Sequence, residues 1–208
     1  MTATADRALT AADVSRETAE KLASYSELVR KWSPAINLVS RSDLEHLEQR
    51  HILDSLQLSH FLPKTKANWT DIGSGGGLPG IVLAIVAKEK SPEVSFQLIE
   101  SDQRKAAFLR TAARTLELNV KVHASRSEDL KPLNADVVSA RALGSLKLLL
   151  GHTSRHLGPN GRGLFMKGRN HDEEIIEAKK SWSFEVERFV SLTDDAARIL
   201  LISDLHHV

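Results

Sequence analysis

Residues 71–80, Asp-Ile-Gly-Ser-Gly-Gly-Gly-Leu-Pro-Gly, decide the fold of this chain. The apolar segment 69–72 has the character of a strand, and the run 81–87 after the glycines favours a helix. Glycine accepts positive φ angles and lets a ligand approach the backbone closely, because it has no Cβ. Pro79 suits the first turn of a helix, where its missing N–H is not needed. The stretch therefore predicts a strand, a tight loop and a helix, with a nucleotide-type pocket at the carboxyl end of the strand.

The spacing of the glycines narrows the choice of ligand. Gly75-x-Gly77-x-x-Gly80 matches a dinucleotide fingerprint, which is weak alone, and no Gly-Lys-Ser/Thr follows, which excludes a P-loop. Two features favour S-adenosylmethionine over NAD. Asp71 offers a carboxylate to an ammonium group, and the glycines begin early, at Gly73. The alternative is a turn without a ligand, which the entropic cost of five glycines disfavours.

Length and composition indicate a single full domain with a substantial core. The chain has 208 residues, of which 41% are hydrophobic and 26% charged. It has no cysteine, which excludes disulfides, cysteine-ligated zinc and a thiol nucleophile. No apolar stretch approaches the length of a membrane span, and residues 1–17 lack the apolar segment of a signal peptide. We therefore expect a cytoplasmic protein without a membrane partner. We also expect a monomer, although composition does not fix the oligomeric state.

Charge is distributed unevenly along a chain whose net charge is only +1. Residues 66–170 contain 16 Lys and Arg against 9 Asp and Glu, whereas residues 171–208 contain 4 against 9. A basic block of this kind suits a polyanionic partner such as nucleic acid. An ordinary solvated surface explains the same charges equally well.

The first 65 residues are expected to form a helical extension ahead of an α/β domain at 66–208. Apolar residues recur at helical spacing over 16–32, and Ser33-Pro34 is expected to end that helix. Ser42-x-x-Glu45 has the pattern of a capping box and predicts a second helix over 43–62, stopped by Pro63.

From residue 66 onward, strand and helix patterns alternate, which predicts a doubly wound parallel sheet. Strands are expected at 69–72, 94–100, 120–124, 135–140, 162–167, 184–190 and 197–203, and helices near 79–89, 103–117, 143–157 and 171–180. Only residues 191–196 separate the last two strands, too few for a crossover helix, so these strands should pair antiparallel. A seven-stranded, mostly parallel sheet with an antiparallel last strand is the Rossmann-like arrangement of class I S-adenosylmethionine-dependent methyltransferases.

Polar residues that follow the second and third strands are candidates for contacts with an adenosine. Glu100 ends its strand at nearly the spacing at which an acidic residue meets ribose hydroxyls. The alternative is a charge at a helix N-terminus, beside the caps Ser101 and Asp102. Ser127 and Glu128 are placed to meet the adenine, although by spacing alone a polar turn explains them better.

Arg141 follows the fourth strand, where a guanidinium can hold a phosphate or carboxylate in bidentate geometry. The alternative is a surface arginine that flanks a helix. Other basic residues are candidates for phosphate contacts, with a solvated face as the rival for those on the helix: Arg104, Lys105, Arg110, Arg114, Arg126, Lys167 and Arg169.

Two histidine patterns remain. His51, Asp54 and Ser55 share one face of the second predicted helix, so the cluster either has a structural role or reaches toward the substrate entrance. His152 and His156 have helical metal spacing but no evident third ligand, so no metal site is expected.

These motifs, taken in order, resemble the bacterial small-subunit ribosomal RNA guanine-N7 methyltransferase family, also called glucose-inhibited division protein B. The resemblance covers about residues 37–169, and glycine stands at position 76, where relatives often have proline. It rests on Asn37-Leu-Val-Ser, Arg50-His-Ile-Leu-Asp-Ser, residues 71–80, Ser139-Ala-Arg-Ala and Lys167-Gly168.

The resemblance implies an S-adenosylmethionine site and an RNA substrate. The implied cofactor residues are Gly73, Leu78, Ser127, Glu128 and Arg141, with Glu100 at the ribose. The loop pattern itself adds Asp71, Gly75 and Gly77 to the expected cofactor site. The implied acceptor is N7 of a guanine in the decoding-region loop of 16S rRNA, as free RNA or in a small-subunit particle. We expect Arg126, Lys167, Arg169, His51 and Asp54 to face that RNA.

The chemistry of this transfer requires alignment more than proton transfer. Guanine N7 presents a lone pair at neutral pH, so no general base is needed. Catalysis then consists mainly of holding N7 close to the methyl group and in line with it. We therefore expect Arg141 to be a positioning group and no residue to transfer a proton. Two rivals stay open: a methyltransferase for a small molecule or a protein, and a non-catalytic module that binds RNA or senses nucleotides.

Overall fold

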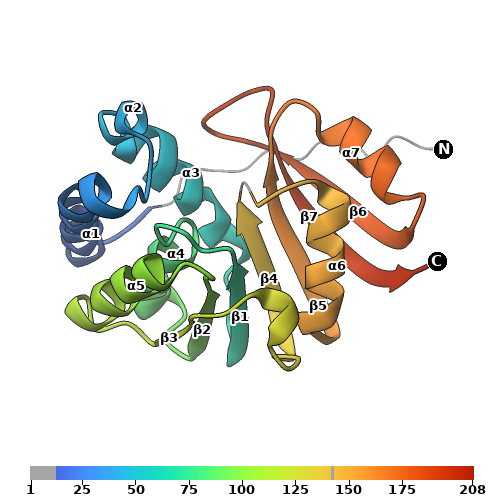
Figure 1. The fold of residues 1–208 in the computed structure, drawn as a ribbon, viewed down its shortest axis with the longest axis horizontal. Helices are drawn as coiled ribbons and strands as arrows, with labels where there is room; N and C mark the ends of the chain where they lie inside the picture. Colours follow the sequence, from blue (N-terminus) through green and yellow to red (C-terminus); the bar gives the residue numbers. More distant parts are fainter. Residues whose placement is uncertain (1–12, 142) are drawn as a thin grey trace.

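The computed structural model describes residues 13–141 and 143–208, and within them seven strands form one sheet in the order β3-β2-β1-β4-β5-β7-β6 (Figure 1). The strands are β1 (Ala67–Ile72), β2 (Val94–Ile99), β3 (Val120–His123), β4 (Ala135–Arg141), β5 (Leu157–Lys167), β6 (Trp182–Val190) and β7 (Arg198–His207). Strands β1 to β5 pair parallel with one another. Strand β7 pairs antiparallel with both β5 and β6, which confirms the predicted hairpin.

Helices and short helical turns connect these strands. They are α1 (Arg16–Ile36), α2 (Arg41–Leu44), the π turn η1 (Glu48–Ile52), α3 (Leu53–Leu56), the 3-10 turn η2 (Gln57–Phe61), α4 (Gly80–Lys90), α5 (Gln103–Thr115), the 3-10 turn η3 (Ser127–Asp129), α6 (Leu146–His156) and α7 (His171–Ala178). None of these helices has the length and apolar character needed to cross a bilayer.

The two faces of the sheet carry different helices, because successive side chains of a strand point to opposite sides. Trp69, Phe96 and Leu164 pack in one apolar cluster with α1, α3, α4 and α5. Phe165 and Leu200 pack on the other face with α6 and α7 (Figure 1). The sheet is therefore covered on both faces, as expected of a parallel α/β fold.

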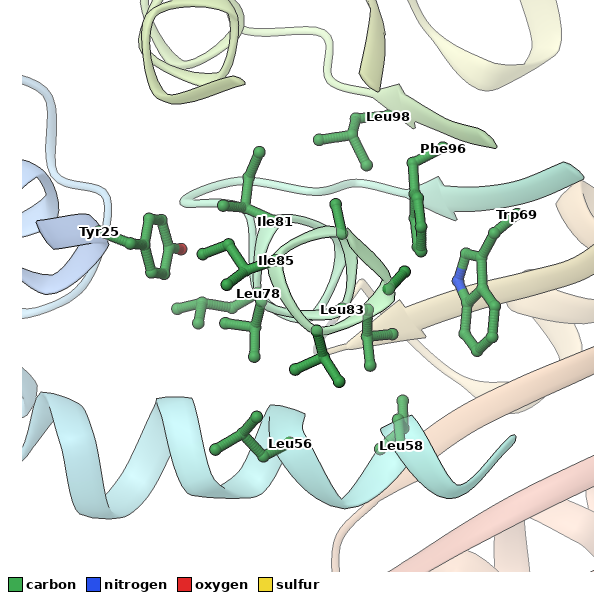
Figure 2. Close-up of a cluster of buried hydrophobic side chains, with 14 of the residues drawn as sticks. Tyr25, Leu56, Leu58, Trp69, Leu78, Ile81, Leu83, Ile85, Phe96 and Leu98 are labelled. Atoms are coloured by element: carbon green, nitrogen blue, oxygen red, sulfur yellow. The ribbon is translucent and has the colours of Figure 1, made fainter. Parts of the chain in front are cut away.

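Helix α4 is buried on all sides, since every residue from Gly80 to Ala87 is buried. Figure 2 shows this helix end-on, with Tyr25 of α1, Leu56 and Leu58 of the α3–η2 segment, and Trp69 and Phe96 of the sheet around it. A helix that is apolar all round needs such an environment. The N-terminal segment shares its core with the sheet, and the domain boundary near residue 65 stays a prediction.

Two predicted helix limits in the N-terminal segment are wrong. Helix α1 continues through Pro34 to Ile36 and ends at Asn37, whose φ of 51° and N–H bond to the Ser33 carbonyl form a left-handed cap. The chain from residue 41 does not form one regular helix, because it winds as α2, η1, α3 and η2 in turn.

The predicted capping box is also displaced by two residues. Ser40, and not Ser42, caps α2: its hydroxyl accepts from the Asp43 N–H at 3.1 Å and donates to the Asp43 carboxylate at 2.6 Å. The later π turn matters for the site, because it carries His51 on the side of the sheet's carboxyl edge.

Candidate functional site

The glycine loop connects β1 to α4, and its backbone has the conformation that its sequence predicts. Gly73, Gly75 and Gly77 have φ angles of +66°, +55° and +88°, a region in which side chains are disfavoured. The Gly77 N–H donates to the Ser74 carbonyl at 2.7 Å and closes the turn. The course of the chain therefore favours glycine at these three positions.

The space around the loop differs from one glycine to the next. A Cβ on Gly77 would lie 2.5 Å from Cγ1 of Ile81, and one on Gly73 would lie 2.5 Å from a methyl carbon of Leu143. A Cβ on Gly75 would meet nothing nearer than the Gly73 carbonyl oxygen, at 3.8 Å. Packing therefore constrains Gly73 and Gly77, whereas Gly75 faces open space that a ligand can occupy.

Asp71 lies beneath the loop and is only 1% exposed. Its Oδ2 accepts from the Ser74 hydroxyl at 2.8 Å, and its Oδ1 accepts from the Ser139 hydroxyl of β4 at 2.6 Å. Burial raises its pKa to about 6, while these hydroxyl bonds and the Gly80 backbone N–H act in the opposite direction. The carboxylate thus joins the loop to β4. Its predicted contact with an ammonium group stays a prediction.

Glu100, at the end of β2, is also engaged with the loop. Its Oε2 accepts from the Gly75 N–H and its Oε1 from the Asp102 N–H, both at 2.8 Å. Asp102 is the N-cap of α5, so the capping contact that rivalled the ribose assignment is present. The carboxylate nevertheless lies against the open side of the loop at Gly75, where a ribose contact is expected.

Tyr25 is a loop contact that the sequence reasoning missed. This buried side chain of α1 donates its hydroxyl to the Gly76 carbonyl, and burial raises its pKa. The helical spacing identified Tyr25 as an apolar position of the first helix, and nothing local to it pointed to a loop 51 residues away. Helix α1 therefore stabilises the loop directly.

Ser127 and Glu128 lie in η3, after β3, but only Ser127 is buried. The Ser127 hydroxyl lies 3.0 Å from Nε2 of His156 on α6, and burial lowers the pKa of His156. Glu128 is exposed and lies 3.9 Å from both Arg126 and His152. No group of three or more His, Asp or Glu in the described ranges is placed to hold a metal ion.

A cleft of about 690 Å³ opens at the carboxyl ends of β4 and β5. The π turn, α3 and the β6–β7 connection form its other walls. Arg141 lines the cleft and is bonded to Nδ1 of His51 through Nη2, while its Nε lies 3.6 Å from Oδ2 of Asp54. The structure thus unites Arg141 with His51 and Asp54, which the sequence reasoning had treated separately. Ser55 is buried and donates to the His51 carbonyl at 2.7 Å.

The two predicted RNA contacts at the end of β5 differ in their surroundings. Lys167 is largely buried, and its ammonium donates to the Gly144 carbonyl at 2.8 Å and pairs with Glu174 at 2.7 Å. Arg169 is exposed. The charge of Lys167 is therefore compensated inside the protein, whereas that of Arg169 faces solvent.

The loop and the cleft lie side by side because β1 and β4 are neighbours at the centre of the sheet. The chain leaves β1 toward α4 on one face and leaves β4 toward α6 on the other. Ligands of open α/β sheets bind at such a switch point, outside the carboxyl ends of the strands. The arrangement can hold one molecule against the loop and present it to a second molecule in the cleft.

The family described as GidB, rRNA small subunit methyltransferase G, matches residues 18–200. The chain is 54% identical over 198 residues to the ribosomal RNA small subunit methyltransferase G of Cereibacter sphaeroides (strain ATCC 17025), with 95% of each chain covered. It is 48% identical over 195 residues to the protein of that name from Paracoccus denitrificans, covering 93% of this chain and 98% of the relative.

Solved structures show the same fold at low sequence identity. M. jannaschii TYW2 in complex with AdoMet is 16% identical with a TM-score of 0.54, covering 82% of this chain and 78% of that chain. A SAM-dependent methyltransferase from Aquifex aeolicus is 14% identical with a TM-score of 0.54, covering 86% and 97%. The fold is thus the one that S-adenosylmethionine-dependent methyltransferases use, as predicted.

Proposed function

Because this chain belongs to the GidB family of small-subunit rRNA methyltransferases, we infer that it transfers a methyl group from S-adenosylmethionine to N7 of a guanine in the decoding-region loop of 16S rRNA. The observation that carries this inference is the glycine loop: of its glycines with positive φ, Gly75 alone leaves space for a Cβ, and it lies beside a carboxylate at the switch point of the sheet. The same edge of the sheet bears the cleft that receives the acceptor.

The loop side of the site fits S-adenosylmethionine, which when bound supplies an electrophilic methyl group. Gly75 leaves room against the backbone, and Glu100 offers carboxylate oxygens to ribose hydroxyls. Ser127 and Glu128 in η3 flank the adenine, and Leu78 supports the loop from the apolar cluster. Asp71 holds the loop in shape through Ser74 and Ser139.

The cleft side of the site places the acceptor without a general base. Guanine N7 is unprotonated at neutral pH, so holding it in line with the methyl group is the main task. Arg141 is the positioning group: it lies at the end of β4, only partly exposed, and both its charge and its orientation are fixed by protein partners.

The RNA partner is 16S rRNA, as free RNA or in a small-subunit particle, and the protein acts on it in the cytoplasm as a monomer. Arg126 and Arg169 are exposed near the carboxyl edge and are suited to phosphate contacts. Lys167 contributes indirectly, by fixing Glu174 and the Gly144 turn.

The cofactor site is tested by replacing Gly75 with asparagine. Asparagine tolerates a left-handed backbone, so Gly75→Asn should keep the fold while its side chain fills the open space. Titration calorimetry should show the Kd for S-adenosylmethionine rising about tenfold or more. The matched control is Gly151→Asn on the exposed face of α6, where a Cβ would meet nothing nearer than 3.9 Å. Unchanged affinity in a folded Gly75→Asn protein would remove the loop from the site.

The acceptor is tested with unmethylated small subunits, 16S rRNA and labelled S-adenosylmethionine. Mass analysis of nuclease digests should place the label on a guanosine as the N7-methyl product. Label on another base, or on protein, would contradict the acceptor assignment while leaving the cofactor site intact. The absence of any label would overturn the activity.

A further inference from the structure

The guanidinium of Arg141 is held along one edge by two residues of a distant segment. Its Nη2 bonds to Nδ1 of His51, 90 residues away in sequence, and its Nε lies 3.6 Å from Oδ2 of Asp54. All three side chains are less than one-fifth exposed. The opposite edge is free: Nη1 is buried and has no hydrogen-bond partner among the described residues.

Of these two partners, Asp54 is itself held by further hydrogen bonds. Oδ1 of Asp54 accepts from Nε2 of Gln57 at 2.8 Å and from the Thr193 hydroxyl at 2.7 Å. Gln57 in turn accepts from the Leu192 N–H at 2.9 Å. The network therefore ties the β6–β7 connection and α3 to the end of β4, around the cleft.

The protonation state of His51 follows from its partner. Arginine only donates, so Nδ1 of His51 accepts and the ring proton sits on Nε2, 3.7 Å from the Asp43 carboxylate. Burial and the neighbouring Arg141 charge lower the pKa of His51, which keeps the ring neutral at neutral pH. A neutral histidine is the form that this contact requires.

Building on the function proposed above, we propose that His51 and Asp54 are positioning residues that hold Arg141 with its Nη1 edge directed to an oxygen of the bound reactants. A buried guanidinium N–H without a partner is costly, so an acceptor is expected when the site fills. The acceptor is a carboxylate, carbonyl or phosphate oxygen, supplied either by S-adenosylmethionine or by the RNA. Misplacement of such a group by about 1 Å costs on the order of 100-fold in rate.

The test is a set of variants at the two positions, assayed for methylation of unmethylated small subunits. His51→Leu removes the acceptor and should lower kcat/KM by about 10- to 100-fold. His51→Asn retains an acceptor near the position of Nδ1 and should restore most of that loss. Asp54→Asn keeps an oxygen for Gln57 and Thr193 but loses the charge that faces Arg141, and should fall between them. His46→Leu, an exposed position on the same segment, is the matched control.

A double-mutant comparison separates positioning from a direct or merely structural role. In an Arg141→Ala background, His51→Leu and Asp54→Asn should cause no further loss of kcat/KM, because they act through the missing side chain. The single variants His51→Leu and Asp54→Asn also identify the molecule that supplies the acceptor oxygen. If only the KM for S-adenosylmethionine rises, the oxygen belongs to that molecule; if only the KM for the small subunit rises, it belongs to RNA. Either result supports the proposal.

The pH profile gives an independent readout. Protonation of His51 would turn its Nδ1 into a donor facing the Arg141 guanidinium, so wild-type kcat/KM should fall on the acid side, below pH 6.5. Asp43 and Asp54 favour the ring proton, whereas Arg50 and Arg141 oppose it. His51→Asn cannot titrate and should lose this limb of the profile.

Losses that persist in full in the Arg141→Ala background would overturn the proposal, as would wild-type kinetics in both His51→Leu and Asp54→Asn. A wild-type protein that leaves rRNA unmethylated would overturn the proposed function and this inference with it. An active wild type with unaffected variants overturns the inference alone.

Discussion

At the scale of single residues, Asp71 shows how burial converts a simple side chain into a pH-dependent element of the loop. The folded-state pKa of about 6 lies above the ordinary value of 3.8. The protonated form is therefore favoured by folding. Its stabilisation is complete below about pH 4 and is lost as the pH rises through 6.

Replacement of Asp71 with asparagine should remove this dependence. Relative to Asp71→Asn, the wild type should lose on the order of 3 kcal/mol of unfolding free energy between pH 4 and pH 7, because the shift in its pKa is a stability difference. Denaturant unfolding of both proteins across this range measures the difference. If the unfolding free energies of the two proteins differ by the same amount at every pH, the loop does not destabilise the ionised form of Asp71.

Sequence reasoning named the candidate residues of the site but not their partners. It named Arg141, His51 and Asp54 from two motifs, yet the contact between them joins segments 90 residues apart and has no local signature. It treated Lys167 as a free cation, because the Glu174 that neutralises it lies on a later helix. Residue types are visible in a sequence, whereas charge compensation depends on the packing of distant elements.

At the scale of elements, α1 acts as a support for the glycine loop. The Tyr25 hydroxyl is the link, since it satisfies the Gly76 carbonyl in a buried environment. Tyr25→Phe leaves that carbonyl without its donor and should lower stability by about 1–2 kcal/mol. It should also weaken S-adenosylmethionine binding several-fold, because the loop is less well fixed.

Thermal unfolding and titration calorimetry measure the two effects. Ser24→Ala, on the exposed side of the same helix, is the control, because the Ser24 hydroxyl donates to the carbonyl of Glu20 within that helix. A Tyr25→Phe protein that loses stability but binds the cofactor normally would restrict α1 to a packing role.

The elements themselves were largely predictable from periodicity. All seven strands and the helices of the α/β domain were predicted, because alternation and apolar runs are local signals. The limits of two strands were wrong: β5 begins at Leu157 and not at residue 162, and β7 ends at His207 and not at residue 203. The second helix was predicted wrongly for a physical reason. Its apolar positions, including Leu47, Ile52 and Leu56, keep a near-helical spacing, but the winding changes to bury them while the polar face meets the cleft.

At the scale of the whole molecule, the direction of the strands decides at which edge of the sheet a basic residue lies. The basic block of residues 66–170 supplies the exposed Arg126 and Arg169 near the carboxyl edge. Lys64 and Lys66, by contrast, lie just before the amino end of β1 and so at the opposite edge. Binding of a polyanion should therefore depend on the first pair and not on the second.

The joint variant Arg126→Ala, Arg169→Ala should reduce the salt dependence of RNA binding. Each lost phosphate contact lowers the slope of log K against log salt by about 0.7 to 0.9. Filter binding of 16S rRNA at several salt concentrations measures the slope, with Lys64→Ala, Lys66→Ala as the control for a change of two charges. Equal slopes in the two double variants would show that RNA does not meet the carboxyl edge through these arginines.

The π turn at Glu48–Ile52 limits which sequence changes this protein can accept during evolution. Such a turn accommodates one residue more than regular winding does, and each residue rotates a helix by about 100°. Deletion of one residue there would rotate His51 about the helix axis relative to the apolar residues that follow it, so its side chain would no longer point into the cleft. Selection should therefore remove insertions and deletions from residues 48–52, even at positions where substitutions are accepted.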